Sequence, residues 1–175
     1  MGFYAIVRGP LGVGKKSVAR QLAAELDGEY VSIDAILDRY DLEEWEDGYI
    51  SVGSFVRANE YAAEVARSAI QRGRPAVVDG NFYHRAAIED LERRLPFLHA
   101  VFTLVAPVEE CVRRDRQRSP SYGPKAVRDV FEKVADVDYG TYVDATRPIE
   151  SVVRELVERS RNLGVAPRNP RSGRP

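Results

Sequence analysis

Nine residues near the start of the chain have the types and spacing of a loop that binds phosphate groups. They read Gly-Pro-Leu-Gly-Val-Gly-Lys-Lys-Ser from Gly9 to Ser17, with four residues between Gly9 and Gly14. A strand-like run precedes them and a helix-like run follows, which is the context such a loop requires. Glycines let successive backbone N–H groups converge on phosphate oxygens at the start of a helix. We expect a nucleotide's phosphates to be bound by Gly9, Gly12, Val13, Gly14, Lys15, Lys16, Ser17 and Val18.

The two lysines of this loop have different expected roles. Lys15 is placed to reach the terminal phosphates and to neutralise charge during catalysis. The next position usually holds a Ser or Thr that helps to bind Mg²⁺, but here it is Lys16, and the hydroxyl follows at Ser17. The geometry of a metal site is therefore left open, and a glycine-rich turn without a ligand is the alternative.

Two aspartates follow strand-like runs. Asp34 comes after residues 29–33, and Asp79 closes the run that begins at residue 75. Ligands of open parallel sheets bind beyond the carboxyl ends of the strands. We expect Asp34 to act as a catalytic base on an acceptor hydroxyl, and Asp79 to hold Mg²⁺ together with Ser17. Asp34 has a second interpretation, as the N-cap of a short helix over residues 35–39.

Two further polar residues are candidates for binding the acceptor. Asn81 lies just beyond Asp79, in a loop that also carries aromatic residues. Arg57 lies near the start of a long helix-like run. It either holds a phosphate of the acceptor or pairs with Glu60 or Glu64 across one or two helical turns.

Four arginines lie between residues 113 and 118, ahead of a loop that contains Pro and Gly. Arg114 and Arg118 would share one face of a helix at i, i+4. Arginine makes bidentate contacts with phosphate, and a loop over residues 119–123 can open and close over a site. We expect Arg114 to contact the nucleotide and both arginines to stabilise charge during catalysis. A solvated charged face is the alternative.

The elements that must position these residues alternate along the chain. Strand-like runs alternate with helix-like patterns, which indicates a parallel sheet with helices on both faces. The length of the chain fits a single domain. We predict a domain over residues 1–161 and a flexible tail rich in Pro and Arg over 162–175. The strand-like runs cover residues 3–7, 29–33, 75–78, 98–105 and 141–143, and the longer helix-like patterns cover 55–70, 85–95, 108–118 and 149–161.

Composition narrows the possible functions. A formal net charge of -1 gives no field that would gather nucleic acid or an anionic membrane. Charge is uneven, because residues 25–47 carry ten acidic side chains and one basic one, whereas 107–128 carry six basic and three acidic ones. The single cysteine and the absence of a long apolar run lead us to expect a cytoplasmic protein without a membrane partner.

With these residues assembled, the chain resembles the P-loop kinases of the nucleoside-monophosphate kinase and shikimate kinase-like group over about residues 3–161. The resemblance implies a three-layer α/β P-loop NTPase fold with a five-stranded parallel sheet ordered 2-3-1-4-5 and an arginine-bearing lid after the fourth strand. ATP and Mg²⁺ are the implied cofactors. Adenylate kinases carry Gly-Lys-Gly-Thr where this chain has residues 14–17, so Ser17 is similar to their threonine. Residues 78–83 look like a stretch in uncharacterised archaeal P-loop kinases.

The implied function is transfer of the γ-phosphoryl group of ATP to a hydroxyl or phosphate of a small-molecule or nucleotide acceptor. Two alternatives stay open. A polynucleotide 5′-hydroxyl kinase would use Asp34 equally well, although the acidic residues on the acceptor side disfavour nucleic acid. A regulatory nucleotide-binding module without transfer activity is suggested by Lys16.

Overall fold

A five-stranded parallel sheet forms the centre of the computed structural model, which describes residues 2–163. The strands lie in the order β2-β5-β1-β6-β7. Once the separate β3–β4 hairpin is left out of the numbering, this is the expected order 2-3-1-4-5, so the fold class and topology are confirmed. The strands are β1 (Phe3–Arg8), β2 (Glu29–Ser32), β5 (Ala76–Gly80), β6 (Leu98–Val105) and β7 (Thr141–Asp144).

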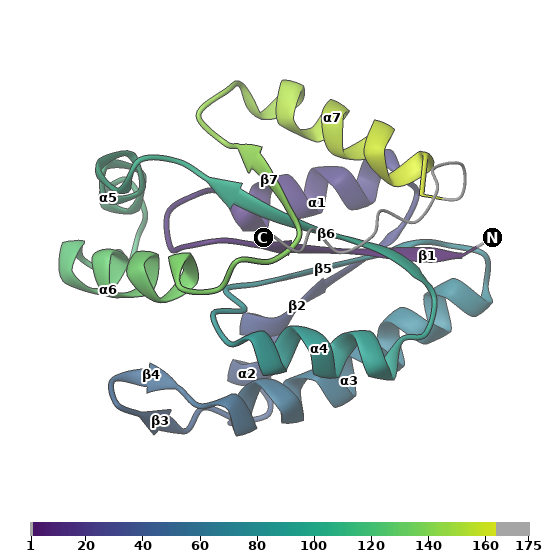
Figure 1. The fold of residues 1–175 in the computed structure, drawn as a ribbon, viewed down its shortest axis with the longest axis horizontal. Coiled ribbons are helices and arrows are strands. Elements are labelled where there is room, and N and C mark those ends of the chain that lie inside the picture. The colour runs from purple at the N-terminus through teal and green to yellow at the C-terminus, as the bar shows by residue number, and fades with distance from the viewer. Residues whose placement is uncertain (1, 164–175) are drawn as a thin grey trace, which may run out of the picture.

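Helices cover both faces of this sheet (Figure 1). Helices α1 (Lys15–Glu25) and α7 (Ile149–Arg161) cover one face, and α2 (Ile33–Arg39), α3 (Val52–Gln71) and α4 (Arg85–Arg94) cover the other. The central strand β1 has apolar side chains on both faces because it lies between two hydrophobic cores. Tyr4 and Ile6 pack into the core of α3 and α4, and Ala5 and Val7 into that of α1 and α7.

Two helices and a hairpin stand at the carboxyl end of the sheet. Helices α5 (Val108–Arg116) and α6 (Pro124–Ala135) connect β6 to β7, and we call residues 108–135 the lid segment. Figure 1 shows the small antiparallel hairpin of β3 (Trp45–Glu46) and β4 (Tyr49–Ile50) at the same end of the molecule. These elements surround the edge where a parallel sheet places its ligands.

The observed bounds agree with most of the sequence-based expectations. The helix expected over residues 108–118 ends at Arg116, and α6 and the hairpin were not expected. Residues 164–175, which make up most of the predicted tail, lie outside the described residues, so the division at residue 162 stays a prediction. Among the described residues, no helix is both long enough and apolar enough to span a membrane.

Candidate active site

The register of the sheet brings the expected site residues to one edge. Ser32 is paired with Asp79, and Asp79 with Val7, so Asp34 and the start of the phosphate loop both lie just beyond this line. A cleft of about 370 Å³ opens there. It is lined by Leu11, Gly12, Gly14, Lys15, Lys16 and Ser17 of the loop and α1, by Asp34 and Asp79, and by Arg114, Arg118 and Tyr122 of the lid segment.

Two glycines give the phosphate loop its conformation. Gly12 has a φ of 77°, and a Cβ at this position would overlap the carbonyl oxygen of Cys111 in α5. Gly14 has a φ of 101° and is the N-cap of α1, where no side chain accepts a hydrogen bond from the first turn. The N–H groups at this helix end are therefore available to an anion such as a phosphate.

Lys15 is buried at the floor of the cleft. Its Nζ donates a hydrogen bond to the Pro10 carbonyl oxygen at 3.0 Å. Burial lowers the pKa of the Lys15 ammonium, and the nearby Asp34 and Asp79 carboxylates act in the opposite direction. Lys16 and Ser17 are exposed and line the same cleft. Phosphate oxygens in the cleft would favour the charged form of Lys15.

Asp79 is buried and supplies an anionic oxygen to the cleft. Its Oδ1 accepts a hydrogen bond from the Tyr30 hydroxyl at 3.1 Å, a contact that no sequence pattern indicated. Burial raises the pKa of the Asp79 carboxyl. The Asp79 carboxylate and the Ser17 hydroxyl are oxygen donors of the kind that Mg²⁺ prefers. The described residues contain no group of three or more acidic, His or Cys side chains able to hold a metal. A magnesium ion here would therefore draw most ligands from phosphates and water.

Asp34 lines the cleft and is not the cap of the helix that follows it. Helix α2 begins one residue before Asp34, and the Ser32 side chain caps it, accepting a hydrogen bond from the Ala35 N–H at 3.3 Å. The interpretation of Asp34 as an N-cap is therefore wrong. Its carboxylate lies in the first turn of α2, where the partial positive charge of the helix end favours a negative group.

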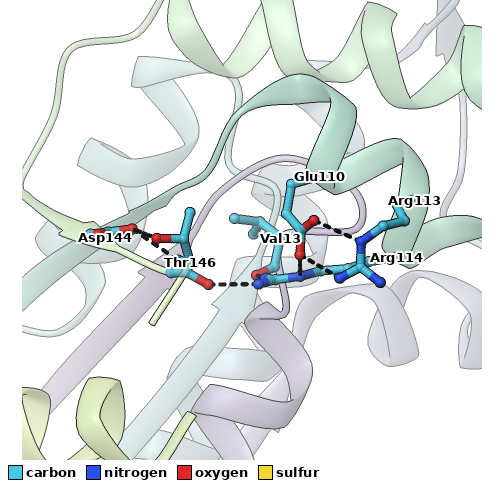
Figure 2. Close-up of polar contacts among 7 residues, drawn as sticks. Val13, Glu110, Arg113, Arg114, Asp144 and Thr146 are labelled. Atoms are coloured by element: carbon cyan, nitrogen blue, oxygen red, sulfur yellow. Dashed lines mark hydrogen bonds and ion pairs between the residues drawn. The ribbon is translucent and has the colours of Figure 1, made fainter. Parts of the chain in front are cut away.

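Arg114 joins the lid segment to the phosphate loop. Its guanidinium donates to the Val13 carbonyl at 2.9 Å, to the Ala145 carbonyl at 2.9 Å and to Glu110 at 2.7 Å. Figure 2 shows Glu110 between Arg113 and Arg114, and Arg114 reaching toward Val13. Hydrogen bonds from these arginines, Arg113 first, lower the pKa of Glu110 to about 2. Glu110 was not among the predicted site residues, although its spacing of three and four residues from the two arginines predicts such pairs.

Arg118 lies in the loop after α5, so the expectation that it shares a helix face with Arg114 is wrong. Its guanidinium stacks over the ring of Tyr122 at 4.8 Å. The buried carboxylate of Asp115 accepts hydrogen bonds from the N–H groups of Tyr122 at 3.2 Å and Gly123 at 3.0 Å. These hydrogen bonds hold the loop folded back on α5. This folded loop, and not a helix face shared with Arg114, brings Arg118 to the cleft.

Arg57 and Asn81 do not line the cleft. Arg57 forms an ion pair with Glu44 at 3.0 Å and donates to the Leu42 carbonyl, so the predicted pairing with Glu60 or Glu64 is wrong. Asn81 is buried, and its Oδ1 has no hydrogen-bond partner in the described part of the chain.

The two residues after Phe82 hold the hairpin in place. The Tyr83 hydroxyl accepts a hydrogen bond from the Ile50 N–H at 2.8 Å, and Nε2 of His84 lies 2.9 Å from the Ile50 carbonyl oxygen. Strand β4 is therefore fixed to the loop that follows β5 and Asp79. These two contacts were not predicted from the polar and aromatic residues of this loop.

Comparisons with known proteins agree with this architecture. A family model described as an AAA domain matches residues 5–137, which is more than half of the chain. No curated protein matches it. A gluconokinase from Sinorhizobium meliloti 1021 is 18% identical with a TM-score of 0.67, over 92% of this chain and 95% of that one. A sugar kinase from Janibacter sp. HTCC2649 is 18% identical with a TM-score of 0.74, over 90% and 94%.

A shikimate kinase from Aquifex aeolicus vf5 is 16% identical with a TM-score of 0.56, over 94% of this chain and 99% of that one. At these identities the three structures show a shared fold. The chain therefore belongs to the AAA-domain family and has the P-loop kinase fold of the shikimate kinase and nucleoside-monophosphate kinase-like group.

Proposed function

We propose that the protein transfers the γ-phosphoryl group of ATP to a hydroxyl group of a small-molecule acceptor. The observation that carries this proposal is the convergence of three kinds of group in one cleft. They are the loop with Lys15, the carboxylates Asp34 and Asp79, and the arginines of the lid segment. Phosphoryl transfer requires held phosphates, neutralised charge and a positioned nucleophile, and each requirement has a candidate here.

The loop and the arginines bind the nucleotide. The free N–H groups at the start of α1 cradle the β- and γ-phosphates, and Lys15 exchanges its hydrogen bond to Pro10 for phosphate oxygens. Arg114 and Arg118 add positive charge from the opposite wall of the cleft. When Mg²⁺ is bound, Ser17 and Asp79 would hold it, and the ion would neutralise phosphate charge.

Asp34 acts on the acceptor. As the acceptor oxygen bonds to the γ-phosphorus, the bond from phosphorus to the β–γ bridging oxygen breaks and ADP leaves. The hydroxyl proton passes to the Asp34 carboxylate. Asn81, two residues beyond Asp79, is buried and lies outside the cleft lining, so we assign it no contact with the acceptor.

A hydroxyl is a better candidate than a phosphate as the accepting group. Arg57, the residue expected to hold an acceptor phosphate, is already occupied by Glu44 and the Leu42 carbonyl. The names of two similar structures, a gluconokinase and a sugar kinase, point in the same direction. We therefore infer a polyhydroxylated acceptor, and a nucleoside monophosphate is the less favoured one.

The test is a screen for acceptor-dependent ADP release with a panel of sugars, sugar acids and nucleotides. Lys15→Ala should lower turnover by about 10²- to 10³-fold, because it removes a charge aimed at the reacting phosphates. Lys125→Ala is the matched control, since Lys125 lies on the exposed surface of α6 and pairs with Asp129. Equal activity of the two variants would contradict the site assignment. ATP binding without turnover on any acceptor would favour a regulatory module.

A further inference from the structure

A fully buried arginine lies directly before the phosphate loop, outside the cleft. Arg8 is the last residue of β1 and has no exposed surface. Its guanidinium donates to four oxygens, all of them neutral. These are the carbonyl oxygens of Phe82 at 3.3 Å, Val134 at 3.0 Å and Val137 at 2.9 Å, and the Thr103 hydroxyl at 3.1 Å.

These acceptors belong to separate segments around the cleft. Phe82 lies in the loop after Asp79 with an unfavourable φ of 45°, a conformation that persists only where surrounding contacts such as this hydrogen bond hold it. Val134 and Val137 lie at the carboxyl end of α6, where the lid segment returns to the sheet. Thr103 in β6 links Arg8 to residue 139, because its hydroxyl accepts a hydrogen bond from Arg8 and donates one to the Tyr139 carbonyl at 2.6 Å.

A contribution to the stability of the fold does not by itself explain a charged side chain at position 8. Burial lowers the pKa of Arg8 to about 10, so the group is still protonated at neutral pH. No carboxylate in the described part of the chain forms an ion pair with it, and the charge of the nearby Asp138 offsets the desolvation only in part. An apolar side chain of similar length would fill the space without that cost. What it could not do is donate to three segments at once, which the planar guanidinium does.

We propose that Arg8 is a positioning residue that holds the carboxyl end of the lid segment and the loop after Asp79 in register with the phosphate loop. The helix end at Val134 is the fixed end of the lid segment. A movement of α5 and α6 over the cleft would therefore pivot about residues 134–138. The effect on turnover rests on the proposed function, whereas the effect on these contacts does not.

The test compares Arg8→Met with Arg8→Lys. Met keeps most of the buried volume and removes every donor, and Lys keeps the charge but lacks the planar fork. Hydrogen exchange of the Asp136 and Val137 amides should accelerate by about tenfold or more in Arg8→Met, because the helix end loses charged hydrogen bonds. The kcat should fall by about 10- to 100-fold while the KM for ATP changes within a few fold. Arg8→Lys should lie between Met and the parent.

Val153→Ala is the control for a loss of global stability. Val153 is buried in α7, which packs on α1 and β6, so this variant should lower the free energy of unfolding and leave both kcat and the exchange at residues 136 and 137 unchanged. If Arg8→Met behaves like Val153→Ala, Arg8 serves stability only and the proposal is overturned. Parent-like behaviour of Arg8→Lys in both readouts would also overturn it, since charge alone would suffice.

A third variant covers the case in which Arg8→Met does not fold. Thr103→Val removes the hydroxyl between Arg8 and Tyr139 and keeps the size of the side chain. It should accelerate exchange around residue 139, and unchanged exchange would count against the proposal. A parent protein that phosphorylates no acceptor would defeat the proposed function, but the exchange measurements would still decide the role of Arg8.

Discussion

At Asp34, the effect of a substitution on catalysis can be separated from its effect on the stability of helix α2. Because Ser32 caps α2, Asp34→Asn removes a base without removing a cap. We expect acceptor-dependent turnover to fall by about 10²- to 10⁴-fold, with ATP affinity unchanged within a few fold. Ser32→Ala should do the opposite, costing about 1 kcal/mol of stability with a smaller effect on turnover. Calorimetry of ATP binding and turnover on the same preparations measures both, and loss of ATP binding in Asp34→Asn would place Asp34 in the metal site instead.

Single residues differ in how far the sequence could predict them. The glycines and Lys15 were predictable because the loop is local, and its backbone conformation depends on residues a few positions apart. Arg8 and Arg57 were not, because a long side chain chooses its partners from segments far along the chain. Arg8 bonds Val137, and no local pattern encodes that contact. The exact role of each site residue stays a prediction.

At the scale of the elements, Glu110 forms ion pairs with Arg113 and Arg114 within helix α5 of the lid segment. Its pKa is about 2 in the folded protein, against an ordinary value of 4.5, so the carboxylate stabilises the fold above about pH 4.5 and this stabilisation is lost as the pH falls toward 2. In Glu110→Gln the free energy of unfolding should depend less on pH across that window. Urea unfolding at a series of pH values measures this, and an unchanged slope would show that the arginine contacts do not persist in solution.

The elements themselves were mostly predictable, because buried parallel strands are continuous apolar runs. The run from Leu98 to Val105 is β6 without any change of bounds. The two omissions had signals. Helix α6 starts with a proline and carries apolar residues at helical spacing, and Asp47-Gly48 has the residue types of a two-residue hairpin turn. Neither element is a strand of the main sheet.

At the scale of the whole molecule, the nucleotide site should couple to global stability. A ligand that binds only the folded state at 100 times its Kd raises the free energy of unfolding by about 2.7 kcal/mol. We expect Mg²⁺ with ATP to do this for the parent and for Lys125→Ala, and Lys15→Ala to show a smaller increase at the same concentration. Thermal unfolding with and without a chelator measures the effect, and an equal increase in all three proteins would place the nucleotide elsewhere.

The close packing of Gly12 on Cys111 gives the protein a natural reporter. Cys111 is the only cysteine in the chain, and it is fully buried in α5 directly against the phosphate loop. A small thiol reagent can reach its sulfur only when α5 separates from that loop or the core opens. The labelling rate of the native protein therefore measures how often Cys111 becomes accessible, and its slowing by a nucleotide would report binding without an engineered label.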